Sequence, residues 1–188
     1  YPAKPITLMT AFNAGGGSDV SHRLLEKFAK GVFDQPIVVT YKAGAGGEIG
    51  WTWLVGAKAD GYTIGGVDLP HIVLQPMLRP EGQPGYKTEQ LSPLCGLVYD
   101  ADVVMVPEDG PYKTFKDLIE YAKANPGKVK VATVGKLTGD HLFLMQIEKL
   151  TGAKFTQVPY SGSGKAIPAL LSGEVDAYFR SGSSFLRM

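Results

Sequence analysis

The stretch Phe12–Asp19 offers backbone amide groups rather than reactive side chains. It reads Phe12-Asn13-Ala14-Gly15-Gly16-Gly17-Ser18-Asp19. An apolar run at residues 6–12 predicts a buried strand before it. A helix is predicted after it, with Ser18 or Asp19 as the N-cap, from the helical spacing of Val20, Leu24, Leu25 and Phe28. Without Cβ atoms at three positions, N–H groups can turn toward a common point above the helix N-terminus, where the positive end of the helix dipole also attracts anions. The stretch is therefore predicted to bind a small carboxylate.

Three more loops rich in glycine and small residues follow the same plan, at residues 44–47, 135–139 and 160–164. Each one comes after a strand-like apolar run and before a helical pattern. This alternation indicates an α/β architecture with a mostly parallel sheet. The loops then lie at the carboxyl ends of strands, which is the edge where open α/β sheets bind ligands.

Nucleotide-binding fingerprints fit these loops poorly. Aligning the dinucleotide motif on the first two loops puts Val20 and Ile49 where the third glycine belongs. A P-loop would need Ser or Thr after Lys165, where Ala166 stands. The loops instead combine amides with the hydroxyls of Ser18, Thr138, Ser161 and Ser163, which suits a carboxylate better than a nucleotide.

The histidines and the cysteine give weaker signals. His22 lies inside the first predicted helix and is interpreted as a surface or edge residue. His71 and His141 begin helices after loops, where either a ligand contact or a structural hydrogen bond is possible. Cys95 lies in an apolar run and is expected to be buried. Because no His or Cys pair has metal-ligand spacing, neither a metal site nor a cofactor is predicted.

Composition and patterning bound the remaining possibilities. The 188 residues are 44% hydrophobic and carry 19 Lys plus Arg against 18 Asp plus Glu, which argues against a nucleic-acid partner. No apolar run reaches the roughly 18 residues of a membrane span, and the opening Tyr1–Pro5 is interpreted as following a removed signal peptide. A helix is predicted over 113–125, capped by Thr114 with Asp117 at capping-box spacing. Two lobes are predicted, 1–98 and 99–188.

An ordered series of motifs along the whole chain resembles the Bug, or TctC-like, family of periplasmic substrate-binding proteins of tripartite tricarboxylate transporters. In the first half these are Lys4-Pro5-Ile6, Gly15-Gly16-Gly17-Ser18-Asp19, Gly44-Ala45-Gly46-Gly47-Glu48-Ile49-Gly50 and Asp60-Gly61-Tyr62-Thr63. In the second half they are Asn125-Pro126-Gly127-Lys128, His141-Leu142, Val158-Pro159-Tyr160-Ser161-Gly162 and Gly173-Glu174-Val175-Asp176.

The resemblance implies a two-lobed periplasmic-binding-protein (type II, Venus-flytrap) fold that closes around a small mono-, di- or tricarboxylic acid. It implies a periplasmic monomer without enzymatic activity or a cofactor, which delivers its ligand to membrane components of a tripartite tricarboxylate-type transporter. The loops 12–19 and 43–47 would hold one carboxylate, and loops 135–138 and 160–163 would cover the far end. The expected site residues are Phe12, Asn13, Ala14, Gly15, Gly16, Gly17, Ser18, Asp19, Ala45, Gly46, Gly47, Asp68, His71, Gly135, Lys136, Thr138, His141, Tyr160, Ser161 and Ser163.

Three departures from the family pattern qualify this resemblance. Asn13-Ala14 replaces a common proline, Lys136 could reach a second carboxylate, and the chain stops at Met188, where relatives continue. The second lobe is therefore expected to be truncated at its C-terminus, without its closing segments. Two alternatives stay open: an enzyme acting on a carboxylic acid with His141 as base, or a sensor or regulatory ligand-binding module.

Overall fold

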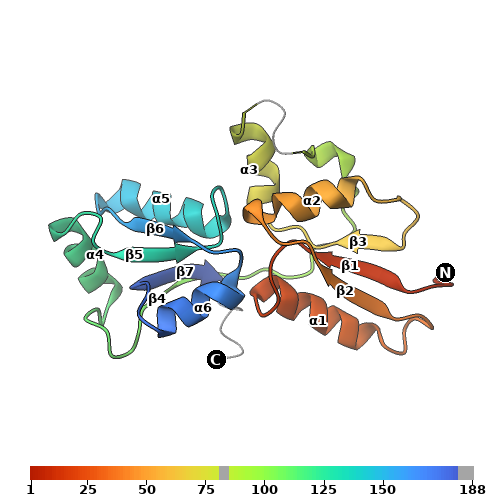
Figure 1. Cartoon of the computed structure of the whole chain (residues 1–188), viewed down its shortest axis with the longest axis horizontal. Helices are drawn as coiled ribbons and strands as arrows, with labels where there is room; N and C mark the ends of the chain where they lie inside the picture. Colours follow the sequence, from red (N-terminus) through yellow and green to blue (C-terminus); the bar gives the residue numbers. More distant parts are fainter. Residues whose placement is uncertain (81–84, 182–188) are drawn as a thin grey trace. The chain divides into compact units, whose positions relative to one another are not determined.

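The computed structural model describes residues 1–80 and 85–181, which divide into two compact units, Tyr1–Tyr99 and Asp100–Met188. Each unit has its own β-sheet and its own helices (Figure 1). The predicted α/β alternation is present in both units. The first two small-residue loops follow strands of the first sheet, and the last two follow strands of the second sheet. The chain end at 183–188 lies outside the described residues. None of the described helices is long and apolar enough to cross a membrane.

The first unit is built on a parallel three-stranded sheet in the order β2-β1-β3. Helices α1 and α2 lie on opposite faces of this sheet (Figure 1). The chain therefore leaves β1 at a topological switch point, where connections depart to both sides. The elements are β1 (Ile6–Thr10), α1 (Gly17–Ala29), β2 (Ile37–Tyr41), η1 (Ala45–Gly47), α2 (Glu48–Val55), β3 (Thr63–Gly65), α3 (His71–Leu78) and η2 (Thr88–Gln90).

An aromatic cluster fills the space between α2 and α3 in the first unit. The fully buried Trp51 ring lies with its centroid 6.2 Å from Phe12, 5.4 Å from His71 and 5.8 Å from Tyr86. Trp51 Nε1 donates to the carbonyl of Gly66 at 3.1 Å, so its one polar group is satisfied. The cluster fixes α2 and α3 relative to the end of β3.

The second unit has a four-stranded sheet in the order β4-β7-β5-β6, in which β4 runs antiparallel to β7 and the other pairs are parallel. Helices α5 and α6 lie on opposite faces (Figure 1). Its core includes the fully buried Leu118, Val131 and Phe179. The elements are β4 (Asp102–Met105), α4 (Phe115–Ala124), β5 (Lys130–Thr133), α5 (Gly139–Thr151), β6 (Thr156–Pro159), α6 (Ser163–Leu171) and β7 (Ala177–Ser181).

The predicted capping box at the start of α4 is confirmed. Thr114 Oγ1 accepts from Asp117 N–H at 3.1 Å, and the Asp117 carboxylate accepts from Thr114 N–H at 2.8 Å. The box satisfies two N–H groups that would otherwise lack partners at the helix start. The capping box could be predicted from the sequence because Thr114 and Asp117 are only three residues apart.

The prediction that Cys95 is buried was wrong. Its thiol is exposed, and Leu94 and Tyr99 beside it are 79% and 97% exposed. The apolar run Leu91–Val98 forms no strand with the described residues, since Pro93 and Gly96 interrupt it. Hydrophobic composition alone therefore overestimated burial.

The interpretation of His22 as a surface residue was also wrong. His22 is 4% exposed, and its Nδ1 lies 2.6 Å from Thr10 Oγ1 of β1. The ring lies against the backbone of Gly66, where an added Cβ would lie 2.1 Å from His22 Nε2. A glycine on the neighbouring strand end thus makes room for the imidazole, while Leu24 and Phe28 of the same helix are exposed.

Burial of His22 should make the stability of the first unit pH-dependent. Desolvation lowers the pKa of His22, against the opposing effect of Asp68 and Asp19. An unfolded histidine takes up its proton near a pKa of about 6.5, so below that pH the unfolded state binds more protons than the folded state. Urea unfolding followed by the fluorescence of Trp51 and Trp53, both in α2, should show stability falling from pH 7 to 5. His22→Gln should flatten this slope; an unchanged slope would contradict the assignment.

Close packing of α2 against the strands depends on Gly50. A Cβ at Gly50 would lie 2.9 Å from both Ala11 Cα and the Lys42 carbonyl oxygen, which are backbone atoms that cannot move away alone. Gly50→Ala should destabilise the first unit by about 1–3 kcal/mol in the same fluorescence assay. The matched control is Gly56→Ala at the end of α2, where the nearest atom is 3.6 Å away and which should change stability by less than about 0.5 kcal/mol. Equal effects would show that Gly50 packing is unimportant.

Candidate functional site

The first glycine loop leaves the start of α1 without a side-chain cap. The N-cap residue is Gly16, and no side chain bonds the first turn from that position. The N–H groups of Gly17 and Ser18 belong to the first helical turn and so have no acceptor within the helix. The prediction of Ser18 or Asp19 as N-cap was wrong, because the helix begins at Gly17 and both residues lie inside its first turn.

Asp19 folds the loop back onto α1. Its Oδ2 accepts from Gly15 N–H at 2.8 Å, and the residue is only 3% exposed. Gly15 has a positive φ of 84°, a conformation that favours glycine. One amide of the predicted anion site is therefore already bonded within the protein, which leaves the amides nearer the helix axis as the available donors.

The second loop has four consecutive residues with positive φ, Gly44 to Gly47. It opens α2 at the N-cap Gly47, again without a side-chain cap. Two side chains of α3 and its end hold the loop carbonyls: Gln75 Nε2 donates to Gly46 O at 2.9 Å and Arg79 Nη2 to Ala45 O at 3.2 Å. Because Gln75 and Arg79 hold two carbonyl groups of the loop, contacts with α3 and its C-terminal end fix the loop conformation.

A hydrogen bond joins the connections that leave β1 and β3. Ser18 Oγ donates to Asp68 Oδ1 at 2.9 Å, across the topological switch point of the first sheet. The predicted site residues Phe12 and His71 have buried side chains, with ring centroids 5.8 Å apart. Their side chains pack within the unit, and Ser18 and Asp68 lie nearer the loop surface.

The third loop, in the second unit, repeats the arrangement of the first. Thr138 is the N-cap of α5 and makes no side-chain cap bond, while the buried Asp140 in the first turn accepts from Val134 N–H at 2.5 Å. Thr138 Oγ1 contacts Asp140 Oδ1 and lies 2.7 Å from Gly135 O. Lys136 is exposed.

The fourth loop uses most of its polar side chains inside the second unit. Ser163 Oγ lies 2.7 Å from Tyr178 Oη, and Tyr160 Oη donates to Glu174 at 2.7 Å. Helix α6 follows the N-cap Gly162 without a side-chain cap. Of the four loop hydroxyls singled out from the sequence, those of Ser18, Thr138 and Ser163 are thus bonded to protein groups. The loops offer mainly backbone amides.

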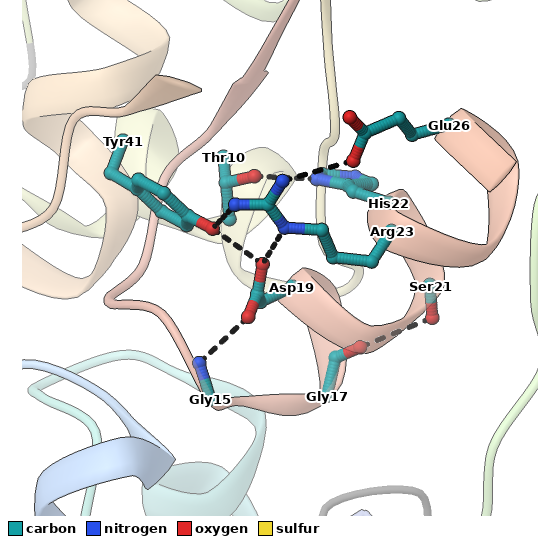
Figure 2. Close-up of polar contacts among 9 residues, drawn as sticks. All are labelled: Thr10, Gly15, Gly17, Asp19, Ser21, His22, Arg23, Glu26 and Tyr41. Carbon is teal, nitrogen blue, oxygen red and sulfur yellow. Dashed lines mark hydrogen bonds and ion pairs between the residues drawn. The ribbon is translucent and has the colours of Figure 1, made fainter. Parts of the chain in front are cut away.

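Sequence reasoning missed several residues that position the loops. Gln75 and Arg79 reach the second loop from more than 25 residues away, so no local pattern could reveal them. Tyr41 and Arg23 bond around Asp19 (Figure 2). The spacing of Asp19 and Arg23, one helical turn apart, was the one signal that could have indicated this contact.

Comparison with known proteins identifies the family. A model described as "Tripartite tricarboxylate transporter family receptor" matches residues 21–186. Protein BugT of Bordetella pertussis is 35% identical over 183 residues, covering 94% of this chain and 54% of BugT. The chain spans about half the length of the curated relatives it matches, from 50% to 54%.

Solved structures agree with this family match. One described as a periplasmic transporter superposes with a TM-score of 0.92 at 33% identity, over 98% of this chain and 62% of that one. MatC from Rhodopseudomonas palustris with bound malate gives a TM-score of 0.85 at 26% identity, over 96% and 61%. The fold is that of periplasmic binding proteins, and the chain belongs to the TctC family of tripartite tricarboxylate transporter receptors.

Proposed function

We propose that this chain forms the ligand-binding part of a periplasmic receptor that captures a small organic carboxylate and delivers it to a tripartite tricarboxylate-type membrane transporter. The family and the malate bound by MatC support the class of ligand. The periplasmic location and the membrane partner rest on the family. We further propose that the protein binds its ligand as a monomer and does not convert it to a product.

One observation carries this proposal. Helix α1 begins at a glycine N-cap with no side-chain cap, at the switch point of the first sheet. Helices α2, α5 and α6, which follow the other small-residue loops, also start without a side-chain cap, whereas α4 has a complete capping box. Uncapped first turns carry N–H donors and a partial positive charge, which together favour a carboxylate.

The candidate ligand groups are the amides of Gly16, Gly17 and Ser18 in the first loop and those of Ala45 and Gly46 in the second, with Asp68 beside Ser18. The amide of Gly47 is already bonded to Gly44 O at 3.0 Å. Loops 135–138 and 160–163 of the second unit remain proposed ligand contacts, with Lys136 as the cation for a carboxylate. Asn13, Ala14 and Ser161 remain proposed contacts on the same grounds of loop position.

The geometry gives little support to an enzyme with His141 as base. His141 Nδ1 accepts a hydrogen bond from Leu137 N–H at 3.1 Å, so the neutral ring carries its proton on Nε2. Burial also lowers the pKa of His141. Neither nitrogen is then a free base in this arrangement, which favours binding without chemistry.

A carboxylate panel tests the proposed function. Isothermal titration calorimetry with malate, succinate, adipate and citrate should find at least one acid that binds with a Kd of about 1 μM or lower. This Kd corresponds to a binding free energy of about −8 kcal/mol. Native mass spectrometry of freshly purified protein should show a retained mass that one of these acids displaces. Failure of all four to bind, or conversion of a bound acid to a product, would contradict the proposal.

Gly16 provides the most selective test of the first loop. Its φ of −88° is allowed for any residue, so Gly16→Ala introduces no backbone strain and acts mainly by its added methyl group. We expect carboxylate affinity to fall by about tenfold or more, because the Cβ obstructs approach to the amides. Gly46 would be a poorer choice, since its φ of 67° would strain a substituted residue. Gly56→Ala is the matched control, and unchanged affinity in Gly16→Ala would refute the role of this loop.

Lys136 should distinguish ligands by their second carboxylate. Lys136→Ala is expected to weaken adipate binding by about threefold to tenfold and to leave hexanoate, which lacks one carboxylate, nearly unchanged. The control is Lys128→Ala, which removes an exposed lysine just before the start of β5 and should change the affinity for neither acid. Equal weakening of both acids by Lys136→Ala would remove this residue from the site.

A further inference from the structure

Asp19 connects both glycine loops of the first unit. Its Oδ2 accepts from Gly15 N–H at 2.8 Å, and its Oδ1 accepts from Tyr41 Oη at 2.7 Å (Figure 2). Tyr41 is the last residue of β2 and leads directly into the second loop. One buried carboxylate thus holds the first loop and ties it to the strand end from which the second loop departs.

Tyr41 stays protonated and donates this bond. Burial and the hydrogen bond to Asp19 raise the pKa of Tyr41. Its oxygen in turn accepts from Arg23 Nη2 at 2.7 Å, so the phenol lies between the carboxylate and the guanidinium. Arg23 Nε also lies 3.4 Å from Asp19 Oδ1, so each of these three side chains contacts the other two.

A buried carboxylate at this position poses an electrostatic problem for an anion site. Asp19 lies in the first turn of α1, the same end at which a ligand carboxylate is proposed to bind. Two like charges close together at low dielectric repel strongly unless one is compensated. Arg23 supplies this compensation from the next turn. Arg23 also pairs with Glu26, whose Oε2 lies 2.9 Å from Arg23 Nη1 and is thus closer than Asp19. The Glu26 side chain is 26% exposed against 4% for Asp19, so solvent screens the Glu26 charge more.

We propose that Asp19 is a positioning residue for the carboxylate site and that Arg23 is its counter-ion. Asp19 holds the glycine loops in place, and Arg23 cancels the charge that this carboxylate would otherwise present to an anionic ligand. The inference rests on the proposed function and adds the residue pair that lets a buried carboxylate support an anion site.

The second unit offers an internal comparison. Asp140 holds its loop in the same way, through Val134 N–H at 2.5 Å. Within the part of the chain that the structure describes, Asp140 forms no ion pair, whereas Asp19 does. The tethering carboxylate thus occurs in both units, but among the described residues an arginine pairs with it only in the first unit.

Two single variants and their combination test the charge relation. Arg23→Gln should weaken malate binding by about fivefold and the monoacid 2-hydroxybutyrate by about twofold, because repulsion grows with ligand charge. Asp19→Asn/Arg23→Gln should return malate affinity to within about twofold of wild type, since the asparagine oxygen can still accept from Gly15 N–H. High salt should shrink the Arg23→Gln effect, because the Arg23 side chain is 43% exposed. Adipate and hexanoate replace this pair if malate does not bind.

Asp19→Ala tests the tether itself. Losing both hydrogen bonds should weaken the diacid and the monoacid equally, by about tenfold or more, whereas Asp19→Asn alone should stay within about threefold of wild type. Tryptophan fluorescence of unliganded protein checks that the first unit remains folded in each variant. Lys116→Gln, which breaks the surface pair with Glu120 in α4, is the matched control for loss of one positive charge and should change no affinity.

The outcomes separate the two proposals. Equal weakening of both acids by Arg23→Gln, or no recovery in the double variant, would overturn the counter-ion role. Unchanged affinity in Asp19→Ala would overturn the tether. If wild-type protein binds none of the panel acids, the proposed function itself fails and this inference with it.

Discussion

The first turn of an α-helix carries N–H groups that lack intrahelical acceptors, and this constraint organises both units. At α4 the chain meets it with a capping box from Thr114 and Asp117. At the four helices after small-residue loops, no N-cap side chain takes that role. Acidic residues inside the first turns of α1 and α5 reach back to the loop instead, so they fix the loop without covering the helix end.

The remaining packing of the first unit supports this open end. The buried Trp51 and His71 fix α2 and α3 behind the loops, and Gln75 holds a carbonyl of the second loop. Glycines allow close approach where side chains would collide, as at Gly50 against Ala11 and at Gly66 against His22. The loops are therefore supported from within the unit. Such pre-organisation reduces the ordering cost of binding.

Local patterns predicted the parts of the structure that depend on near neighbours in the chain. Strand–loop–helix alternation, the four loops and the Thr114 capping box all follow from short-range spacing. Burial of His22 could not be predicted, because it depends on Gly66, which is far along the chain. Exposure of Cys95 could not be predicted either, because strand pairing, not composition, decides whether an apolar run is covered.

The candidate site shows the same division. Glycine content and position predicted which loops could present amides, and the family resemblance predicted their ligand class. The partners of those loops were not predictable, since Asp19 and Tyr41 meet across 22 residues and Arg79 reaches Ala45 across 34. A sequence can therefore indicate which loops carry candidate donors more readily than what holds those loops in place.

The most direct measurement is a two-dimensional ¹H–¹⁵N NMR titration of the protein with malate. If the first loop binds the carboxylate, the amide signals of Gly16, Gly17 and Ser18 should shift together and saturate at one affinity. The amide of Gly15, already bonded to Asp19, should move least among the loop signals. Saturable shifts elsewhere with these three amides unchanged would contradict the account.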